Sequence, residues 1–424
     1  MKAKKLTYVL GMMVIILAFV SCGRKSSSTP NSQADGSFDQ SPSVLLGEVT
    51  IEPSEQERIV MERIVMECTA IAESYAHLYK SALKEHATSL YATSTMILSE
   101  DDFDAIVNFL SESNVPILTA EVEDNECETL INIEGFLDFW RKIEHGESAG
   151  FVVYSLGRDG SLFYHKYSYE DDRKYCTEAS ATWSDDAASV GNLRKEELAF
   201  WDYTEKGNFL FERVYAPPWM GNGRGLIHMG PNNNELVKIA KDYIISVGYY
   251  GNNLFSANWS EDDWESLNFN DLFEFLYRSK YNAIFEDRLC EFDSEQSCYY
   301  IEAAVFESVI GAYFSVPEDI LHSRALYSEL NSGYPWQTIT CSNCVYNGTL
   351  APDVRNYAIN GDGTITIDVD VLCPTHRTDH FFSHRLTVRP LSNGGFQYVS
   401  NEITVPAAGD IPLYCPRVDL QQEQ

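Results

Sequence analysis

Basic residues are scarce in this chain of 424 residues. There are 31 lysines and arginines against 63 aspartates and glutamates, so the formal net charge is -32 at pH 7. Recognition of nucleic-acid phosphates needs a basic field, and adhesion to anionic lipid headgroups needs a basic patch. The charge balance therefore excludes a general nucleic-acid-binding protein and a protein that holds to membranes through its surface charge.

The sequence also lacks a long hydrophobic run outside its N-terminal segment, and it lacks the HExxH motif of zinc proteases. After the N-terminal segment no stretch approaches about 18 uncharged apolar residues, the length that indicates a transmembrane helix. Hydrophobic residues still make up 44% of the chain and aromatic residues 13%, which excludes a disordered chain. We expect a folded body, long enough for roughly two domains, without a membrane-spanning helix.

The N-terminus carries a targeting signal. Three lysines within the first five residues precede an uncharged, mostly apolar run at 6–20, which is too short to span a membrane comfortably. Ser21, a small residue, then stands immediately before Cys22. This pattern resembles the signal peptide of bacterial lipoproteins, in which the cysteine thiol receives a diacylglycerol group before cleavage. An ordinary cleaved signal peptide with an incidental cysteine is the alternative.

The resemblance implies that residues 1–21 are removed and that Cys22 anchors the protein by acyl chains. The protein would then be held at the cell membrane and face its extracytoplasmic side. Residues 22–50 are rich in small polar side chains, which bury too little surface to offset the entropy of ordering. We predict a flexible tether there, with a root-mean-square reach of about 30 Å.

The rest of the chain predicts an α+β fold of two units, each with helices packed on antiparallel sheets. The first domain is placed at 51–230. Apolar spacing and capping signals predict helices from Ser54 to about residue 82, from Ser99 onward, and over 134–144. Alternating patterns then predict strands at 151–156, 161–167, 174–183 and 208–215. The strands follow one another without a βαβ rhythm.

The second domain is placed at 231–419, after a loop rich in Gly, Pro and Asn. Helices are expected at 235–247, 260–276, 298–314 and 318–330. Ser260 is expected to cap the second of them, as Ser99 caps its helix in the first domain. A β-meander over 365–372, 380–389 and 396–405 follows.

Several distinctive segments occur in this second half, at 241–250, 252–255, 259–263, 360–365, 386–391 and 394–401. Together they resemble a family of uncharacterised lipoproteins from anaerobic Gram-positive gut bacteria. That family has no established activity. The resemblance therefore supports the expected location at the membrane and assigns no catalytic residue.

Cysteine and histidine spacing suggests a metal site in the second half. Cys341 and Cys344 form a CxxC pair, and Cys373 and His376 form a CxxH pair. Two such pairs can supply a tetrahedral Cys3His site for a structural zinc ion. Disulfides, including one between Cys373 and Cys415, and buried thiols are the alternatives, and the spacing leaves all three open.

The remaining cysteines and histidines favour structural roles. Besides Cys22 there are nine cysteines, so at least one cannot pair within the chain. Cys68 falls on an apolar helix face, and Cys290 and Cys298 are close enough in sequence for a short disulfide loop. His380 and His384 lie four residues apart on a predicted strand, which puts them on one face of it.

Two loops have features of ligand sites. Tyr215 and Trp219 stand before the glycine-rich run 221–225, where exposed aromatic rings could form a platform for a ligand. The alternative is an ordinary solvent loop, because no phosphate-binding strand precedes it. The run around Asp362 lacks the first and last carboxylates of a calcium loop, so a hairpin turn is expected.

These patterns lead to one hypothesis and two alternatives. The chain is expected to be a lipid-anchored extracytoplasmic protein that acts by binding or in the cell envelope, without catalysis. Its partners would be the membrane, through the acyl anchor, and an envelope component or a glycan, but no nucleic acid. The first alternative, prompted by 25 Tyr, 22 Phe and 7 Trp, is a lipoprotein that binds or hydrolyses carbohydrate. The second is a transporter's solute-binding lipoprotein, which would have two βαβ lobes.

Overall fold

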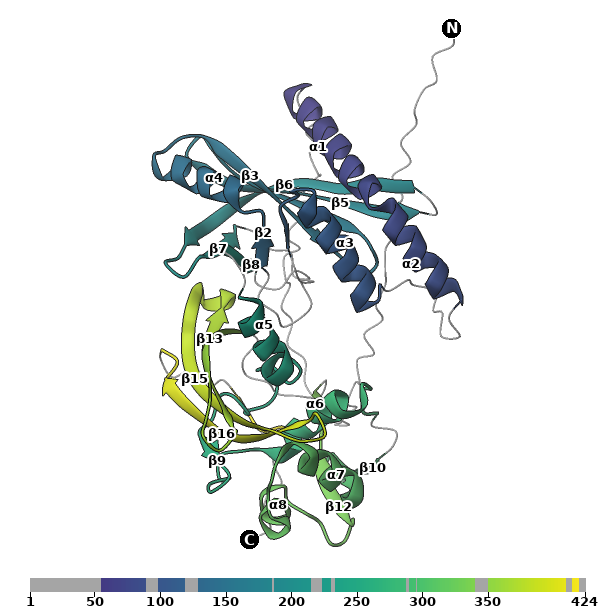
Figure 1. Ribbon diagram of the computed structural model, residues 1–424, viewed down its shortest axis with the longest axis vertical. Coiled ribbons are helices and arrows are strands. Elements are labelled where there is room, and N and C mark those ends of the chain that lie inside the picture. The colour runs from purple at the N-terminus through teal and green to yellow at the C-terminus, as the bar shows by residue number, and fades with distance from the viewer. Residues whose placement is uncertain are drawn as a thin grey trace, which may run out of the picture. The chain divides into compact units, whose positions relative to one another are not determined.

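The computed structural model has the predicted α+β fold, with helices and largely antiparallel sheets (Figure 1). The predicted signal peptide, Cys22 and the tether lie outside the residues it describes. Residues from Pro53 onward belong to one compact unit. The described ranges are 55–88, 98–118, 129–184, 187–214, 223–229, 233–286, 290–294, 296–339, 350–408 and 414–418.

A closed eight-stranded barrel is formed by the first half of the described chain, in the order β1-β2-β8-β7-β6-β5-β4-β3. Parallel pairing of β1 with β3 closes it, β2 and β8 are also parallel, and the other neighbours are antiparallel. The strands are β1 Ile117–Leu118, β2 Thr129–Ile131, β3 Ala149–Leu156, β4 Leu162–Glu170, β5 Arg173–Ser184, β6 Ala187–Tyr203, β7 Asn208–Arg213 and β8 Arg224–Met229.

Both faces of the barrel sheet are buried over much of their area. Val153 and Tyr154 are neighbours on β3, yet they enter different hydrophobic clusters because successive side chains on a strand point to opposite faces. The cluster of Val153 collects side chains from all eight strands and therefore fills the barrel. The cluster of Tyr154 lies on the outer face, beneath helices.

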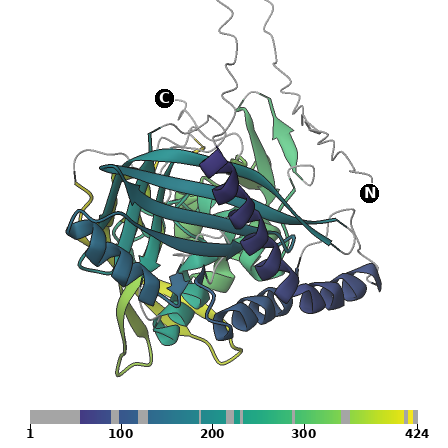
Figure 2. The ribbon, with the colours of Figure 1, turned by 90° about the horizontal axis from the view of Figure 1, so that it is seen from above.

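Helices α1 (Glu55–Ser74), α2 (Ala76–Thr88) and α3 (Glu100–Glu112) cover the outer face, and α1 crosses the barrel strands (Figure 2). The Ser99 cap is confirmed, since its side chain accepts from the Asp102 amide. The single long helix expected over 54–82 is broken at Tyr75. This residue is fully buried and its hydroxyl donates to the Gly160 carbonyl at 3.0 Å, so tertiary packing fixes the break.

Helix α4 (Glu134–Glu144) has the predicted bounds, and β3, β4, β5 and β7 lie where strands were expected. The 17-residue strand β6 was not predicted. Four charged residues follow one another at 194–197, and only Leu198 and Trp201 are buried, so it lacks the hydrophobic alternation that marks a strand in sequence.

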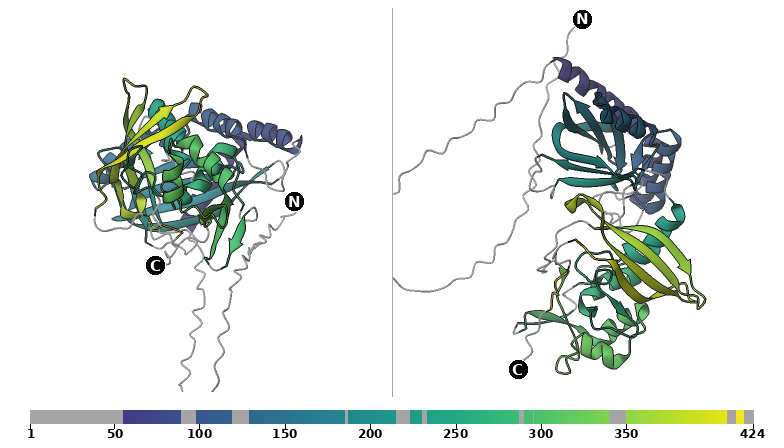
Figure 3. Two further views of the ribbon diagram at one scale, coloured as in Figure 1. Left: turned by 90° about the horizontal axis from the view of Figure 1, so that it is seen from below. Right: turned by 90° about the vertical axis from the view of Figure 1, so that its left-hand side faces the viewer.

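The C-terminal half contains a five-stranded antiparallel sheet in the order β13-β14-β15-β16-β9 (Figure 3). The predicted meander is confirmed, as is the hairpin turn at Asp362, whose carboxylate accepts from the Thr364 amide at 3.0 Å. The strands are β13 Ala351–Ile359, β14 Ile365–Cys373, β15 Thr378–Pro390, β16 Phe396–Val405 and β9 Trp259–Ser260.

Helices and a small sheet share one hydrophobic core with this meander. Three predictions here were wrong, and one of them is the helix over 318–330, which ends at Arg324. Ser260 belongs to β9, and the following helix is capped instead by Asn268, whose side chain accepts from the Asp271 amide. Residues 298–302 form a strand rather than a helical turn. The elements are α5 Asn234–Ala240, a π-helical turn Lys241–Ile245, α6 Phe269–Tyr281, β10 Glu291–Asp293, β11 Cys298–Glu302, α7 Ala303–Tyr313, α8 Glu318–Arg324 and β12 Gly333–Trp336.

A buried ion pair fastens the described C-terminal segment to α6. The Arg417 guanidinium and the Asp271 carboxylate have fully buried side chains, and Nε and Oδ1 are 3.1 Å apart. Glu274 also binds this guanidinium. Burial raises the pKa of Asp271, and the charge of Arg417 opposes the rise. Removing one partner would leave the other buried without its counter-charge.

A second buried polar group, His384, joins the sheet to the segment after the π-helical turn. Its Nδ1 lies 2.8 Å from Asn401 Oδ1, and its Nε2 lies 2.9 Å from the Tyr249 hydroxyl. The imidazole is fully buried, and this burial lowers its pKa to about 4. It is therefore neutral at pH 7, with Nδ1 donating to Asn401 and Nε2 accepting from Tyr249.

Acid should destabilise the fold through His384. In the unfolded chain a histidine titrates near its ordinary pKa of about 6.5. Below that pH the unfolded state binds a proton at this residue and the folded state does not. The contribution of neutral His384 to the free energy of unfolding is therefore complete above about pH 6.5. It falls as the pH drops toward 4, by about 3 kcal/mol in total. Urea unfolding from pH 7 to 4 should show a smaller fall for His384→Gln than for the wild type.

The exposed His145 supplies the control for this measurement. His145→Gln should leave the pH dependence of the unfolding free energy as it is in the wild type. An identical dependence in His384→Gln and the wild type would contradict the role given to His384.

Candidate functional site

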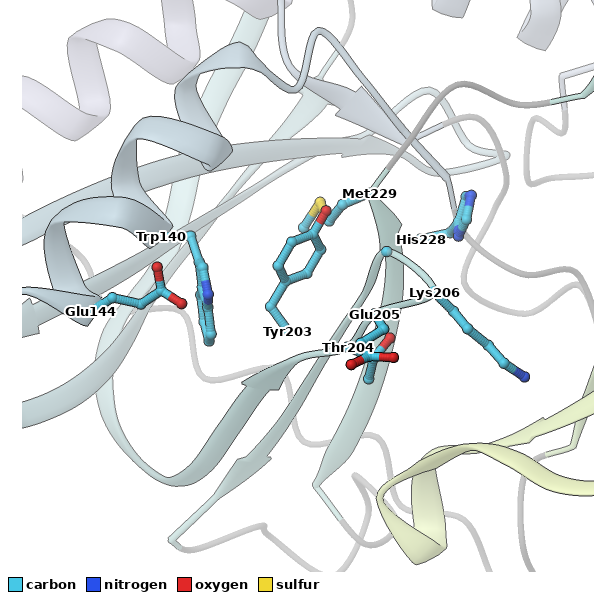
Figure 4. A pocket seen from close by; sticks show the side chains of 9 residues that line it. Trp140, Glu144, Tyr203, Thr204, Glu205, Lys206, His228 and Met229 are labelled. Carbon is cyan, nitrogen blue, oxygen red and sulfur yellow. The ribbon is translucent and has the colours of Figure 1, made fainter.

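An open groove of about 620 Å³ lies between the end of α4 and the end of β6 (Figure 4). Its lining comes from three places in the chain that the closed barrel brings together. They are the last turns of α4, the β6–β7 turn with the residue before it, and the end of β8. The lining residues are Trp140, Glu144, Tyr203, Thr204, Glu205, Lys206, Gly207, His228 and Met229.

The tight β6–β7 turn shapes the groove at Gly207. The Gly207 amide donates to the Thr204 carbonyl at 3.0 Å, and the Thr204 amide donates to the Asn208 carbonyl at 2.9 Å. Gly207 has a φ of +83°, and a Cβ on it would lie 2.9 Å from the Met229 carbonyl oxygen. Only glycine allows this conformation and this close approach to β8.

Two aromatic rings, Trp140 and Tyr203, form the apolar part of the lining. Their centroids are 5.6 Å apart and their planes meet at 61°. Both rings also pack against the buried Phe136, at 6.0 and 5.0 Å. Burial raises the pKa of Tyr203, so the hydroxyl is protonated at neutral pH. The rings are thus held by the barrel core and present a fixed surface to a ligand.

The cation in the lining, Lys206, is already engaged. Its ammonium donates to the Asp370 carboxylate at 2.6 Å and to the Asp379 carbonyl at 3.2 Å, both in the C-terminal half. In Figure 4 its side chain extends away from Trp140 and Tyr203. Its charge is therefore largely balanced by protein groups.

A chain of hydrogen bonds continues from the groove through His228. Its Nδ1 is 2.9 Å from Asn208 Oδ1, and the Asn208 amide nitrogen donates to the Asp379 carboxylate at 2.9 Å. The Thr204 hydroxyl donates to the same carboxylate at 2.6 Å. Burial lowers the pKa of His228, so the imidazole is neutral at pH 7. The network fixes the β6–β7 turn against the meander.

The polar groups near the groove do not form a nucleophilic relay. Ser383, His380 and Asp370 lie together, but the Ser383 hydroxyl is 2.6 Å from Asp370 and 3.5 Å from the imidazole. Nucleophilic catalysis needs the hydroxyl bonded to the base. Ser383 is also buried, and its hydroxyl is bonded to the carboxylate instead.

Residues 146–150, Gly-Glu-Ser-Ala-Gly, match the GxSxG pattern of serine hydrolases, and the expectation from sequence that no such motif occurs was wrong. That motif works when a strand leads through the serine into a helix, so that the hydroxyl stands at a strained turn. Here the order is reversed, because the segment leaves α4 and enters β3, and Ser148 is exposed. The pattern is therefore not a nucleophile elbow in this fold.

The predicted zinc ligands fall only partly within the described residues. Cys341 and Cys344 lie outside them. Cys373 is buried at the end of β14, and the His376 ring stacks on Phe381 at 4.8 Å. The predicted ligand residues Tyr215 and Trp219 also lie outside the described residues.

Two of the disulfides considered from sequence involve only described cysteines, and neither is formed. Cys290 and Cys298 are not joined to each other, and neither are Cys373 and Cys415. Cys68 is a buried thiol, as its place on the apolar face of the helix predicted, and burial raises its pKa to about 12.

Within the part of the chain that is described, one other group of side chains has metal-ligand geometry. His165, Cys176 and Glu178 place their ligand atoms within 4.8 Å of one another on β4 and β5. Both carboxylate oxygens of Glu178 are already bound, one by Arg213 and the other by Arg194. Despite burial, bonds from His165 and Arg213 hold the pKa of Glu178 well below its usual range.

This cluster is therefore better suited to holding strands together than to binding a metal ion. Burial raises the pKa of Cys176 well above its usual value, which keeps the thiol protonated, whereas a zinc ligand must be a thiolate. Two guanidinium groups also bind the carboxylate that a metal ion would need as a ligand. The ion pairs join β5 to β6 and β7 instead.

The profile of a family of unknown function, DUF6070, matches residues 61–417 of the chain. The protein belongs to this family. The match spans the barrel, the groove and the meander, so the DUF6070 region includes every residue that lines the groove. No curated protein and no solved structure shows significant similarity to the chain.

Replacing Gly207 should damage the groove and the fold together. In Gly207→Ala the new Cβ meets the Met229 carbonyl and the residue keeps a strained positive φ, so the free energy of unfolding should fall by about 1–3 kcal/mol. Chemical denaturation measures this. Gly191→Ala on β6 is the control, because a Cβ there has nothing within 4 Å. Equal stabilities of the two variants would contradict the constraint at Gly207.

Proposed function

We propose that this DUF6070 protein is a lipid-anchored extracytoplasmic protein that binds a small organic ligand in the groove, without catalysing a reaction. The observation that carries the proposal is the groove itself, an open cavity of about 620 Å³ with aromatic and carboxylate side chains on rigid elements. Binding sites for small molecules have this size and this mixture of apolar surface with a few polar groups.

The hydrogen bonding around the groove supports binding over catalysis. Catalytic acids, bases and nucleophiles have reactive atoms directed at a substrate. Here Thr204 and Asn208 bind Asp379, and Lys206 binds Asp370, so these groups serve to hold the turn. Side chains of the turn that are held in this way are preorganised for a ligand and are not directed at a substrate.

The membrane anchor rests on the N-terminal sequence. Cys22 follows a lipoprotein-type signal, and the polar stretch at 22–50 would place the folded body away from the bilayer. No helix in the described part of the chain is long and apolar enough to cross a membrane. Attachment through acyl chains at Cys22 would therefore present the groove to the extracytoplasmic space.

Of the two alternatives, carbohydrate binding receives some support, because Trp140 and Tyr203 line the groove and aromatic rings stack on sugars. The solute-binding alternative receives less. Such a protein would have two βαβ lobes, whereas the sheets described here are antiparallel apart from the pairs β1–β3 and β2–β8.

Replacing the anchor cysteine tests the location. When the full-length protein is made in a bacterial host fed an alkyne-tagged fatty acid, the wild type should carry the label and sediment with membranes. Cys22→Ser should be unlabelled, because it has no thiol to acylate. Cys415→Ser, with the same change at a partly exposed thiol, should behave as the wild type. Label on Cys22→Ser would refute the anchor.

Thermal shift against a set of small amines, sugars and amino acids tests the groove. A ligand that binds the folded state raises the melting temperature, so at least one compound should stabilise the wild type more than Trp140→Leu. Circular dichroism would establish that the variant is folded, and Glu144→Gln provides a second variant with a milder change. If no compound distinguishes the wild type from both variants, the groove is not the binding site.

A further inference from the structure

The carboxylates of the groove have no counter-charge among the described residues. Glu144 and Glu205 both line it, and neither carboxylate forms an ion pair or hydrogen bond with another described residue. The nearest basic residues on the same helix, Arg141 and Lys142, pair with Asp138. The groove therefore presents two negative charges that no described side chain pairs with.

The other titratable groups of the groove do not offset these charges. Lys206 is paired with Asp370 at 2.6 Å, and His228 is neutral at pH 7 because burial disfavours its charged form. The net charge of the whole chain is -32, so the surrounding field also attracts cations. An anionic ligand would meet repulsion both at long range and inside the groove.

The aromatic rings add a second attraction for cations. Trp140 precedes Glu144 by four residues on α4, which places the indole and the carboxylate on one face of the helix. Tyr203 stands 5.6 Å from the indole, measured between ring centroids. The faces of Trp and Tyr rings carry negative potential, and quaternary ammonium groups bind in sites built from such rings.

We propose that the groove binds a small organic cation, a quaternary or protonated amine, through the rings of Trp140 and Tyr203 and the carboxylates of Glu144 and Glu205. This assignment rests on the proposed function and names its ligand class. A neutral sugar would use the rings but not the net charge of the lining. The unpaired carboxylates therefore favour an amine over a sugar.

Choline and 3,3-dimethylbutan-1-ol provide a direct test, because they have the same shape and differ in the charge of the central atom. Isothermal titration of the full-length protein in detergent at low salt should show choline binding at least about tenfold more tightly than the alcohol. The affinity for choline should fall as salt is added, because the carboxylates contribute by charge.

Variants assign the binding to the groove. Trp140→Leu should weaken choline binding by about tenfold, whereas Trp140→Phe keeps an aromatic face and should weaken it less. Glu144→Gln should weaken it by about three- to tenfold, since it removes the charge and keeps the shape. The control is Glu147→Gln, an exposed glutamate outside the lining, which should change the affinity by less than about twofold.

The remaining outcomes overturn the inference in distinguishable ways. Equal binding of choline and the alcohol, or binding of N-acetylglucosamine alone with loss in Trp140→Leu, would overturn the amine assignment and leave the groove as a binding site. Choline binding that is unchanged in Trp140→Leu and Glu144→Gln would place it elsewhere and overturn the assignment. Absence of choline binding would overturn it too, and the wider thermal-shift set would then decide whether the groove binds any ligand.

Discussion

The packing of Phe136 among neighbouring aromatic rings is the contact on which both the barrel and the groove depend. Its ring lies within 5.0–6.1 Å of five others, measured between centroids, which come from α4, β3, β6 and β7. This contact holds α4 against the core that fills the barrel. Because Trp140 and Tyr203 are two of those five rings, the core that stabilises the fold also sets the position of the groove's aromatic surface.

Burial of both sheet faces explains why the groove forms where it does. Helices α1 to α3 cover part of the outer face, and the outward side chains Leu210 and Leu226 meet Leu372 of the meander. The β6–β7 turn is then fixed from two sides, by Gly207 against Met229 and by Asp379 through Thr204 and Asn208. A turn fixed in this way loses little entropy when a ligand binds.

The buried carboxylates of the protein and the carboxylates of the groove differ in their pairing. Glu178 is paired with arginines within the barrel, and Asp271 is paired with the buried Arg417. Pairing of this kind offsets the cost of removing a carboxylate from water. Glu144 and Glu205 have no such partner in the part of the chain that the structure describes, and they are exposed to solvent. Their negative charge is therefore available to a ligand, which is the physical basis for expecting a cation there.

Local patterns in the sequence determined the fold class, the bounds of α4, the cap at Ser99 and the meander, because capping and apolar periodicity act over a few residues. Tertiary structure decided the rest. Strand β6 forms through pairing with β5 and β7 although four consecutive residues at 194–197 are charged, and Ser260 pairs with β16 instead of capping a helix. The groove was not predicted because residues 140–144, 203–207 and 228–229 meet only when the barrel closes. Local sequence patterns do not show which distant strands pair.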